Sequence, residues 1–154
     1  MATRYRGTPR QIRALEAYLK LVRASQSVAS RLQGLLSDEG LTLSQVGVLD
    51  ALHHRGPMVQ AELAGKLLMS PSNLTTVVDN LERRGLVVRE RTEEDRRCVQ
   101  VSLTRRGKAL ATRVFPAHAG RIVECMGALS KREQEELGRL CRKLGLYAAA
   151  LADE

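Results

Sequence analysis

The sequence predicts a mainly α-helical fold that carries one small β-hairpin. Leu, Val and Ala dominate the chain, whereas Gly and Pro are few and scattered, as is typical of helical proteins. Apolar residues recur every three or four positions over most of the 154 residues, which is the helical period. Only between Gly85 and Thr104 does the period change to two, as expected for a pair of strands.

The first predicted element is a long helix near the N-terminus. Thr8 serves as its N-cap, Pro9 occupies the first helical position, and Gln11 completes a capping box. We expect Gly40 to end this helix. Its apolar spacing alternates between three and four, which predicts a seam that packs on other helices, in this chain or in a partner subunit. The seam consists of Ile12, Leu15, Leu19, Val22, Ala29 and Leu36, and the polar Gln26 and Gln33 fill two of its later positions.

Three short helices follow the long one. A second capping box, Thr42 with Gln45, opens a helix that ends before Gly56. Met58 and Val59 are extended, and the next helix spans residues 60–68. It turns three apolar side chains inward, namely Leu63, Leu67 and Leu68.

The third short helix has the clearest amphipathic pattern. Ser70 is its N-cap, Pro71 its first residue, and Gly85 closes it. Its buried face is predicted to be Leu74, Val77, Val78 and Leu81.

The hairpin and two helices complete the chain. Residues 86–91 and 98–103 are the predicted strands, and residues 92–97 form their charged tip. Thr104 caps a helix in which Pro116 should introduce a kink or an interruption. Ser130 and Glu133 form a third capping box, and the last helix repeats the three-four seam. That seam consists of Leu137, Leu140, Leu144, Tyr147 and Leu151.

Two short helices, a tight turn, a third helix and a hairpin together predict a winged helix-turn-helix. In this motif the N-terminal part of the last short helix points at DNA base edges, where Ser, Asn and Thr side chains donate or accept hydrogen bonds. The alternative is a capped amphipathic helix with a solvated outer face. The candidate DNA-binding residues on this helix are Ser70, Ser72, Asn73, Thr75, Thr76, Asn80 and Arg83.

Several motifs of this chain occur together, in the same order, in one family. Residues 95–104 (DRRCVQVSLT) match an Asp-x-Arg…Leu-Thr wing signature, and residues 81–87 (LERRGLV) match a Leu-Glu-x-x-Gly-Leu-Val junction. Residues 60–64 (QAELA) and 70–72 (SPS) also fit. The chain therefore resembles the MarR family of bacterial transcription regulators over nearly its whole length.

The resemblance implies a homodimer that binds double-stranded DNA at a pseudo-palindromic operator. Residues 42–104 would be the DNA-binding domain, and residues 1–41 and 105–154 the helical dimerisation region. The family places the Arg of Asp-x-Arg in or near the minor groove, which implies that role for Arg97, with Arg96 beside it. Asp79 would orient Arg97, as in some relatives. The alternative is a solvated tip whose arginines pair with the neighbouring acidic residues.

The resemblance further implies a repressor released by a small-molecule effector. The segment 115–118 (FPAH) is similar to family members associated with quinone-like or aromatic compounds. Candidate ligand-binding residues are Tyr18, Arg23, His53 and His54, although the two histidines also suit the C-terminal end of a helix dipole. The alternative function is a winged-helix module for chromosome architecture or protein interaction, without a ligand response.

Catalysis, metals and membranes have no support in the sequence. The histidines form no spacing typical of a metal site or a catalytic triad, and there is no Gly-rich phosphate loop, so we expect no enzyme and no cofactor. No stretch approaches the roughly 18–20 apolar residues of a membrane span, and no signal peptide is evident, which favours a cytoplasmic protein.

Cysteines and net charge leave two matters open. Cys98 follows two arginines that would activate a thiol, but it alternates with core-type residues, and Cys125 and Cys141 fall on helix faces that look buried. Whether any of them senses oxidants is undecided. The net charge of +8 suggests an acidic partner, yet residues 56–104 contain seven basic and seven acidic residues. The prediction of DNA binding therefore depends on the placement of particular side chains.

Overall fold

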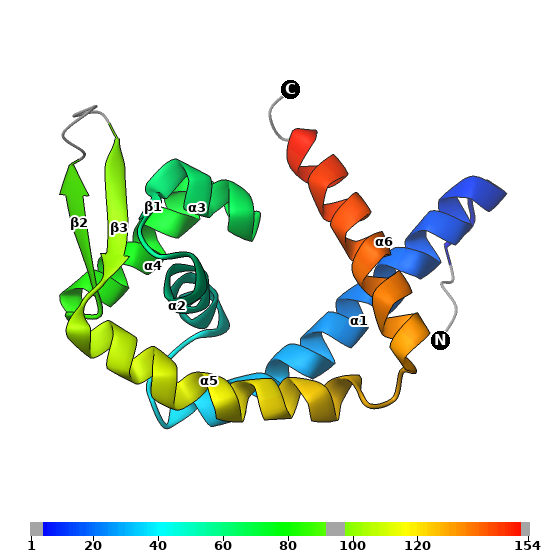
Figure 1. Ribbon diagram of the computed structural model, residues 1–154. Coiled ribbons are helices and arrows are strands. Elements are labelled where there is room, and N and C mark those ends of the chain that lie inside the picture. Colours follow the sequence, from blue (N-terminus) through cyan, green and yellow to red (C-terminus); the bar gives the residue numbers. More distant parts are fainter. Residues whose placement is uncertain (1–4, 92–97, 152–154) are drawn as a thin grey trace.

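The structure is a computed structural model that describes residues 5–91 and 98–151. It is mainly helical with a small antiparallel sheet, as the sequence predicts (Figure 1). In Figure 1, α2, α3, α4 and the sheet cluster at one end of α5, while α1 and α6 cross near its other end. The elements are α1 Pro9–Ser37, α2 Leu43–Arg55, β1 Met58–Val59, α3 Gln60–Leu67, α4 Pro71–Arg83, β2 Val87–Arg91, β3 Val99–Leu103, α5 Arg105–Met126 and α6 Lys131–Ala150.

The predicted helix starts are confirmed by side-chain caps. Complete capping boxes open three helices: Thr8 with Gln11, Thr42 with Gln45, and Ser130 with Glu133. The pKa of the Glu133 carboxyl lies below its usual value because the Ser130 hydroxyl and backbone amide donate to it. The remaining two predicted N-caps also accept from backbone amides: Ser70 from Asn73 and Thr104 from Gly107.

The sheet has three strands in the order β1-β3-β2, one more than the predicted hairpin. The two residues of β1 pair with β3, with Met58 opposite Val101 and Val59 opposite Gln100. The sequence marked this segment as extended, but its partner lies about forty residues further along the chain and has no local signal. This pairing joins the start of α3 to the wing.

A single apolar core holds the sheet and the short helices together. The buried face of α4 is the predicted one, with Leu74, Val77, Val78 and Leu81 all buried. The start of α5 is joined closely to the end of α4, because a Cβ on Gly107 would lie 1.9 Å from the Leu86 carbonyl oxygen. The Thr104 hydroxyl donates to the Gly85 carbonyl at 2.7 Å across the same joint. The winged domain is therefore attached firmly to α5.

One expectation about helices is wrong. Leu68 does not turn inward: it caps α3 in the left-handed conformation with φ 51°, and it is half exposed. The turn between α3 and α4 requires that backbone, and it moves the side chain off the helical stripe. Pro116 does not interrupt α5, which continues from Arg105 to Met126.

The last helix is exposed along its length. None of its residues is buried, although its apolar seam is complete. Cys141 is exposed as well, contrary to the expectation of a buried face, because no residue of α6 is buried among the described residues. The large exposed apolar side chains at this end of the chain are Leu137, Leu140, Leu144, Leu146, Tyr147 and Leu151. No helix in the described part of the chain is both long and apolar enough to cross a membrane.

Candidate nucleic-acid interface

The N-terminal turn of α4 presents small polar side chains to the outside. The Ser70 hydroxyl caps the helix and lies 3.2 Å from the Ser72 hydroxyl. Asn73 is exposed, and its side-chain amide makes no hydrogen bond within the described residues. A free carboxamide at the start of a recognition helix can pair with an adenine through both of its polar atoms. Asn73 therefore has a carboxamide available to an external partner.

The two threonines on α4 are exposed but already hydrogen bonded. The Thr76 hydroxyl donates to the Ser72 carbonyl at 3.1 Å, and the Thr75 hydroxyl donates to the Pro71 carbonyl at 2.9 Å. Thr75 also accepts from Gln60 Nε2 at 3.0 Å. These bonds leave the methyl groups, one lone pair of the Thr75 hydroxyl and both lone pairs of the Thr76 hydroxyl for contacts outside the protein. The hydrogen bonds hold both hydroxyl groups in defined positions.

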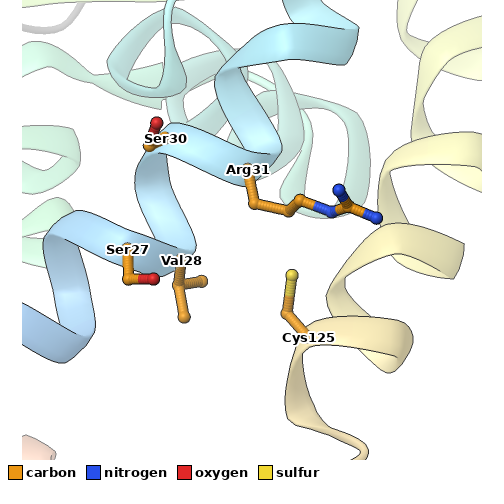
Figure 2. A pocket seen from close by; sticks show the side chains of 5 residues that line it. All are labelled: Ser27, Val28, Ser30, Arg31 and Cys125. Carbon is orange, nitrogen blue, oxygen red and sulfur yellow. The ribbon is translucent and has the colours of Figure 1, made fainter.

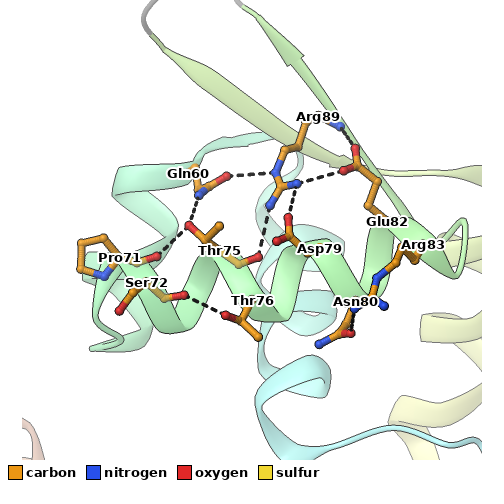
Figure 3. A network of polar contacts seen from close by, with 10 residues as sticks. All are labelled: Gln60, Pro71, Ser72, Thr75, Thr76, Asp79, Asn80, Glu82, Arg83 and Arg89. Carbon is orange, nitrogen blue, oxygen red and sulfur yellow. Dashed lines mark hydrogen bonds and ion pairs between the residues drawn. The ribbon is translucent and has the colours of Figure 1, made fainter.

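Arg89 on β2 connects the wing to α4 (Figure 3). Its Nη1 lies 2.6 Å from Asp79 Oδ1 and 2.9 Å from Glu82 Oε2. Its Nη2 donates to the Thr75 carbonyl at 3.2 Å, and its Nε donates to Gln60 Oε1 at 3.2 Å. One guanidinium thus contacts α4 at three successive turns and the first residue of α3. A planar, permanently charged fork suits such a junction better than a lysine would.

Arg89 is the residue that sequence reasoning missed. A usable signal was present, because alternation places Arg89 on the same face of β2 as the buried Val87. An arginine on the inward face of a strand requires acidic partners, and α4 carries Asp79 and Glu82 at a spacing of three.

The sequence also predicts that Arg96 and Arg97 contact DNA and that Asp79 orients Arg97. Arg96 and Arg97 lie outside the described residues, so their roles stay predictions. Asp79, expected to orient Arg97, pairs with Arg89, and its relation to Arg97 stays a prediction because Arg97 lies outside the described residues. On the last turn of α4, the Arg83 guanidinium donates to Asn80 Oδ1, and the Arg83 side chain is exposed. Asn80 therefore orients Arg83.

A second candidate site lies between α2 and α5. A cavity of about 590 Å³ is lined by His53 and His54 from α2 and by Phe115 and His118 from α5. The rings pack together, with 5.4 Å between the centroids of His53 and Phe115 and 6.1 Å between those of His54 and Phe115. His53 Nδ1 and His118 Nδ1 are buried and have no hydrogen-bond partner among the described residues. Both nitrogens therefore lack the hydrogen bond that a buried polar atom normally makes.

The other two candidate ligand-binding residues lie elsewhere. Tyr18 and Arg23 are exposed on α1 and do not line this cavity. His118 and Phe115 take their place beside the α2 histidines. Periodicity along one helix cannot reveal that pairing, because it depends on how α5 crosses α2. The His54 ring nitrogen lies 3.1 Å from the Asp50 carbonyl oxygen, so this exposed histidine is already partnered.

Cysteines and metal ligands complete the survey of reactive groups. Figure 2 shows Cys125 on α5 and Arg31 on α1 pointing into the same hollow of about 690 Å³. Cys98, at the start of β3, is half-buried. Within residues 5–91 and 98–151, no three His, Cys, Asp or Glu side chains gather in a way that could hold a metal ion.

Comparisons with known proteins agree with this architecture. The model of the MarR family matches residues 41–99. Over 139 residues the chain is 34% identical to the HTH-type transcriptional regulator YkoM of Bacillus subtilis, covering 90% of each protein. Over 84 residues it is 34% identical to the transcriptional repressor MprA of Escherichia coli K12, covering 54% of this chain and 48% of MprA. The solved structure of BpsR from Bordetella bronchiseptica, whose DNA binding is regulated by 6-hydroxynicotinic acid, is similar with a TM-score of 0.75. Its sequence is 27% identical, and the match covers 84% of this chain and 98% of BpsR.

Proposed function

The chain belongs to the MarR family of transcriptional regulators, and from this premise we propose that it is a homodimeric repressor acting on a pseudo-palindromic operator. Members of the family are transcriptional regulators rather than enzymes. The proposed repressor acts in the cytoplasm and leaves its operator when a small molecule binds. One observation carries the proposal: α4 presents a fixed row of polar side chains, and Arg89 holds the wing against it.

Base recognition is assigned to the N-terminal half of α4. Asn73 would read an adenine, while Ser72 and Thr76 would contact neighbouring bases or phosphates. Ser70, Thr75, Asn80 and Arg83 would support these contacts or bind the backbone. Arg96 and Arg97 at the wing tip would enter the minor groove, where a flat cation suits the concentrated negative potential.

A homodimer is supported by the apolar surface that a single chain leaves uncovered. The face of α6 with Leu140, Leu144 and Tyr147 is exposed, and it is larger and more continuous than scattered surface leucines. The apolar seam of α1 is also partly exposed, at Ile12, Leu15, Leu19 and Val22. A second copy supplies a matching surface by symmetry. Two recognition helices would then reach successive major grooves, roughly 34 Å apart.

Effector binding is assigned to the cavity between α2 and α5. Phe115 offers an aromatic wall, and the buried nitrogens of His53 and His118 offer two polar contacts. A small aromatic or quinone-like compound with a hydroxyl, carbonyl or carboxylate group fits both features. The compound would release DNA only if it binds more tightly to a dimer whose recognition helices have a spacing that does not match the operator.

The test is a titration of the full-length protein on DNA from its own promoter at fixed salt, with a scrambled duplex as control. We expect tight binding to the promoter and release by an aromatic probe such as hydroquinone or 6-hydroxynicotinic acid. Equal affinity for both duplexes would contradict operator recognition. Operator binding that no probe of this class weakens would remove the effector from the proposal.

A further inference from the structure

Arg84, the C-cap of α4, makes its contacts away from the DNA-reading face. Its Nη1 donates to the Gly40 carbonyl at 2.7 Å, and its Nη2 donates to the Glu39 carbonyl at 2.8 Å. Both carbonyls belong to the turn that follows α1. One guanidinium thus holds two acceptors that lie more than forty residues away in the sequence. Its neighbour Arg83 is exposed, and within the described part of the chain its guanidinium bonds Asn80 on its own helix.

Glu39 extends this junction to a third helix. Its carboxylate accepts from Arg113 Nη2 on α5 at 2.7 Å, while its backbone carbonyl accepts from Arg84. Gly40 adopts φ 60°, a left-handed conformation that a residue with a side chain adopts only with strain. The ends of α1 and α4 and the middle of α5 therefore meet at two consecutive residues.

Among the described residues, hydrogen bonds tie the C-terminal end of α4 and the residues that follow it to both long helices. On one side Thr104 joins the residues after α4 to the start of α5. On the other side Arg84 joins the last turn of α4 to the end of α1. The buried face of α4 already packs in the apolar core, and these two attachments add directional hydrogen bonds that orient its C-terminal end relative to α1 and α5. In a dimer, α1 and α5 set the frame to which both copies of α4 are fixed.

We propose that Arg84 is a positioning residue that sets the separation and direction of the two recognition helices. The inference rests on the dimeric DNA-binding function proposed above, and it gives Arg84 no contact with DNA. Loss of the two hydrogen bonds from Arg84 to the Glu39 and Gly40 carbonyls would weaken the dimer's preference for one half-site spacing. Removal of a residue that touches DNA would instead lower affinity at every spacing.

The experiment compares R84Q and R84K with R83Q on one duplex and its spacing variants. The duplex is selected from a random pool by the wild-type protein, and one base pair is then inserted or deleted at its centre. Each base pair shifts the half-sites by roughly 3.4 Å and about 35°. We expect the wild type to lose at least about tenfold in affinity on either variant, because its two helices are held in one arrangement.

R84Q and R84K should bind the selected spacing more weakly and lose only about threefold on the spacing variants. R84K keeps the positive charge but cannot bond both carbonyls in the fork geometry of a guanidinium. It therefore distinguishes the effect of the two hydrogen bonds from the effect of the charge. R83Q should keep the wild-type spacing penalty and lower the salt slope by about one. Spacing penalties in R84Q and R84K equal to that of the wild type would overturn the proposal. Failure of the wild type to enrich any sequence would instead contradict the proposed function itself.

A second measurement needs no DNA. Nitroxide labels are attached at T76C in a background without the native cysteines, and the distance between the two α4 helices is measured in the free dimer. We expect one narrow distribution for the wild type and a clearly broader one for R84Q and R84K. Melting temperatures and dimer mass show that each variant is folded. An unchanged width would overturn the role of Arg84 regardless of operator binding.

Discussion

Arg89 on β2 and Asp79 on α4 form an ion pair of 2.6 Å that joins the wing to the recognition helix. Their side chains are 21% and 49% exposed, so the arginine is the more enclosed partner. Glu82 and the Thr75 carbonyl complete its surroundings. The relative position of the two proposed DNA-contacting elements thus depends strongly on one guanidinium.

Replacement of Arg89 by alanine should destabilise the protein. We expect the free energy of unfolding to fall by about 1–2 kcal/mol, because charge-assisted hydrogen bonds are lost while the partner carboxylates stay partly solvated. Urea denaturation measures the change. Arg91→Ala, an exposed position on the same strand, should change stability by less than about 0.5 kcal/mol. Equal effects of the two substitutions would mean that Arg89 does not hold the wing.

Replacement of Asn73 by alanine should relax sequence preference at one base pair. The loss of a two-point contact to adenine lowers discrimination there by about 1–3 kcal/mol, with little change at other positions. Competition binding with single-base variants of the operator measures it. Discrimination that stays intact at every position would assign base reading to another residue.

Replacement of Arg97 by alanine should weaken binding to the operator. It should weaken binding equally to any other duplex whose minor groove has the same width. One lost cation also lowers the slope of log affinity against log salt by about one. Titrations at several salt concentrations provide both values. Unchanged affinity and slope would exclude the wing tip from the interface.

Replacement of Leu140 by glutamate should dissociate the dimer. A charge on the uncovered apolar face of α6 would be buried without a partner in the proposed interface. Sedimentation velocity should report a monomer, whereas Lys143→Glu on the same helix should stay dimeric. A monomeric wild type, or an L140E protein that is still dimeric, would contradict the assigned interface.

Replacement of His118 by leucine should abolish the effector response without lowering stability. A buried nitrogen without a partner is removed, and such a change is neutral or stabilising. The melting temperature should be unchanged or higher, and hydroquinone or 6-hydroxynicotinic acid should no longer release DNA. Ala117→Leu, exposed on the same helix, is the control. A wild-type response in H118L would place the effector elsewhere.

Helix starts and buried helix faces could be predicted because their signals are local. Thr8, Thr42 and Ser130 cap through residues three positions away, and the stripe of α4 repeats within four turns. The pairing of β1 with β3 could not be predicted, because a two-residue strand carries no pattern of its own. Leu68 departed from the periodic pattern because a turn geometry determined its backbone.

The candidate site was predictable to a similar degree. Side chains on the outer face of α4 follow from its stripe, so Ser72, Asn73 and Thr76 were found. Contacts between elements were missed, namely Arg89 with Asp79 and Arg84 with the end of α1. These depend on the separation of elements in space, which neither composition nor periodicity encodes. The cavity histidine His118 was missed as a candidate ligand-binding residue for the same reason.

The central claim is that paired recognition helices bind a specific duplex. The most direct test is the ratio of two dissociation constants at one physiological salt concentration, for promoter DNA and for a scrambled duplex of equal length. The account predicts that the dimer binds promoter DNA at least about 10³-fold more tightly. Equal dissociation constants, with a steep salt dependence for both duplexes, would contradict it and indicate a module that binds DNA by charge alone.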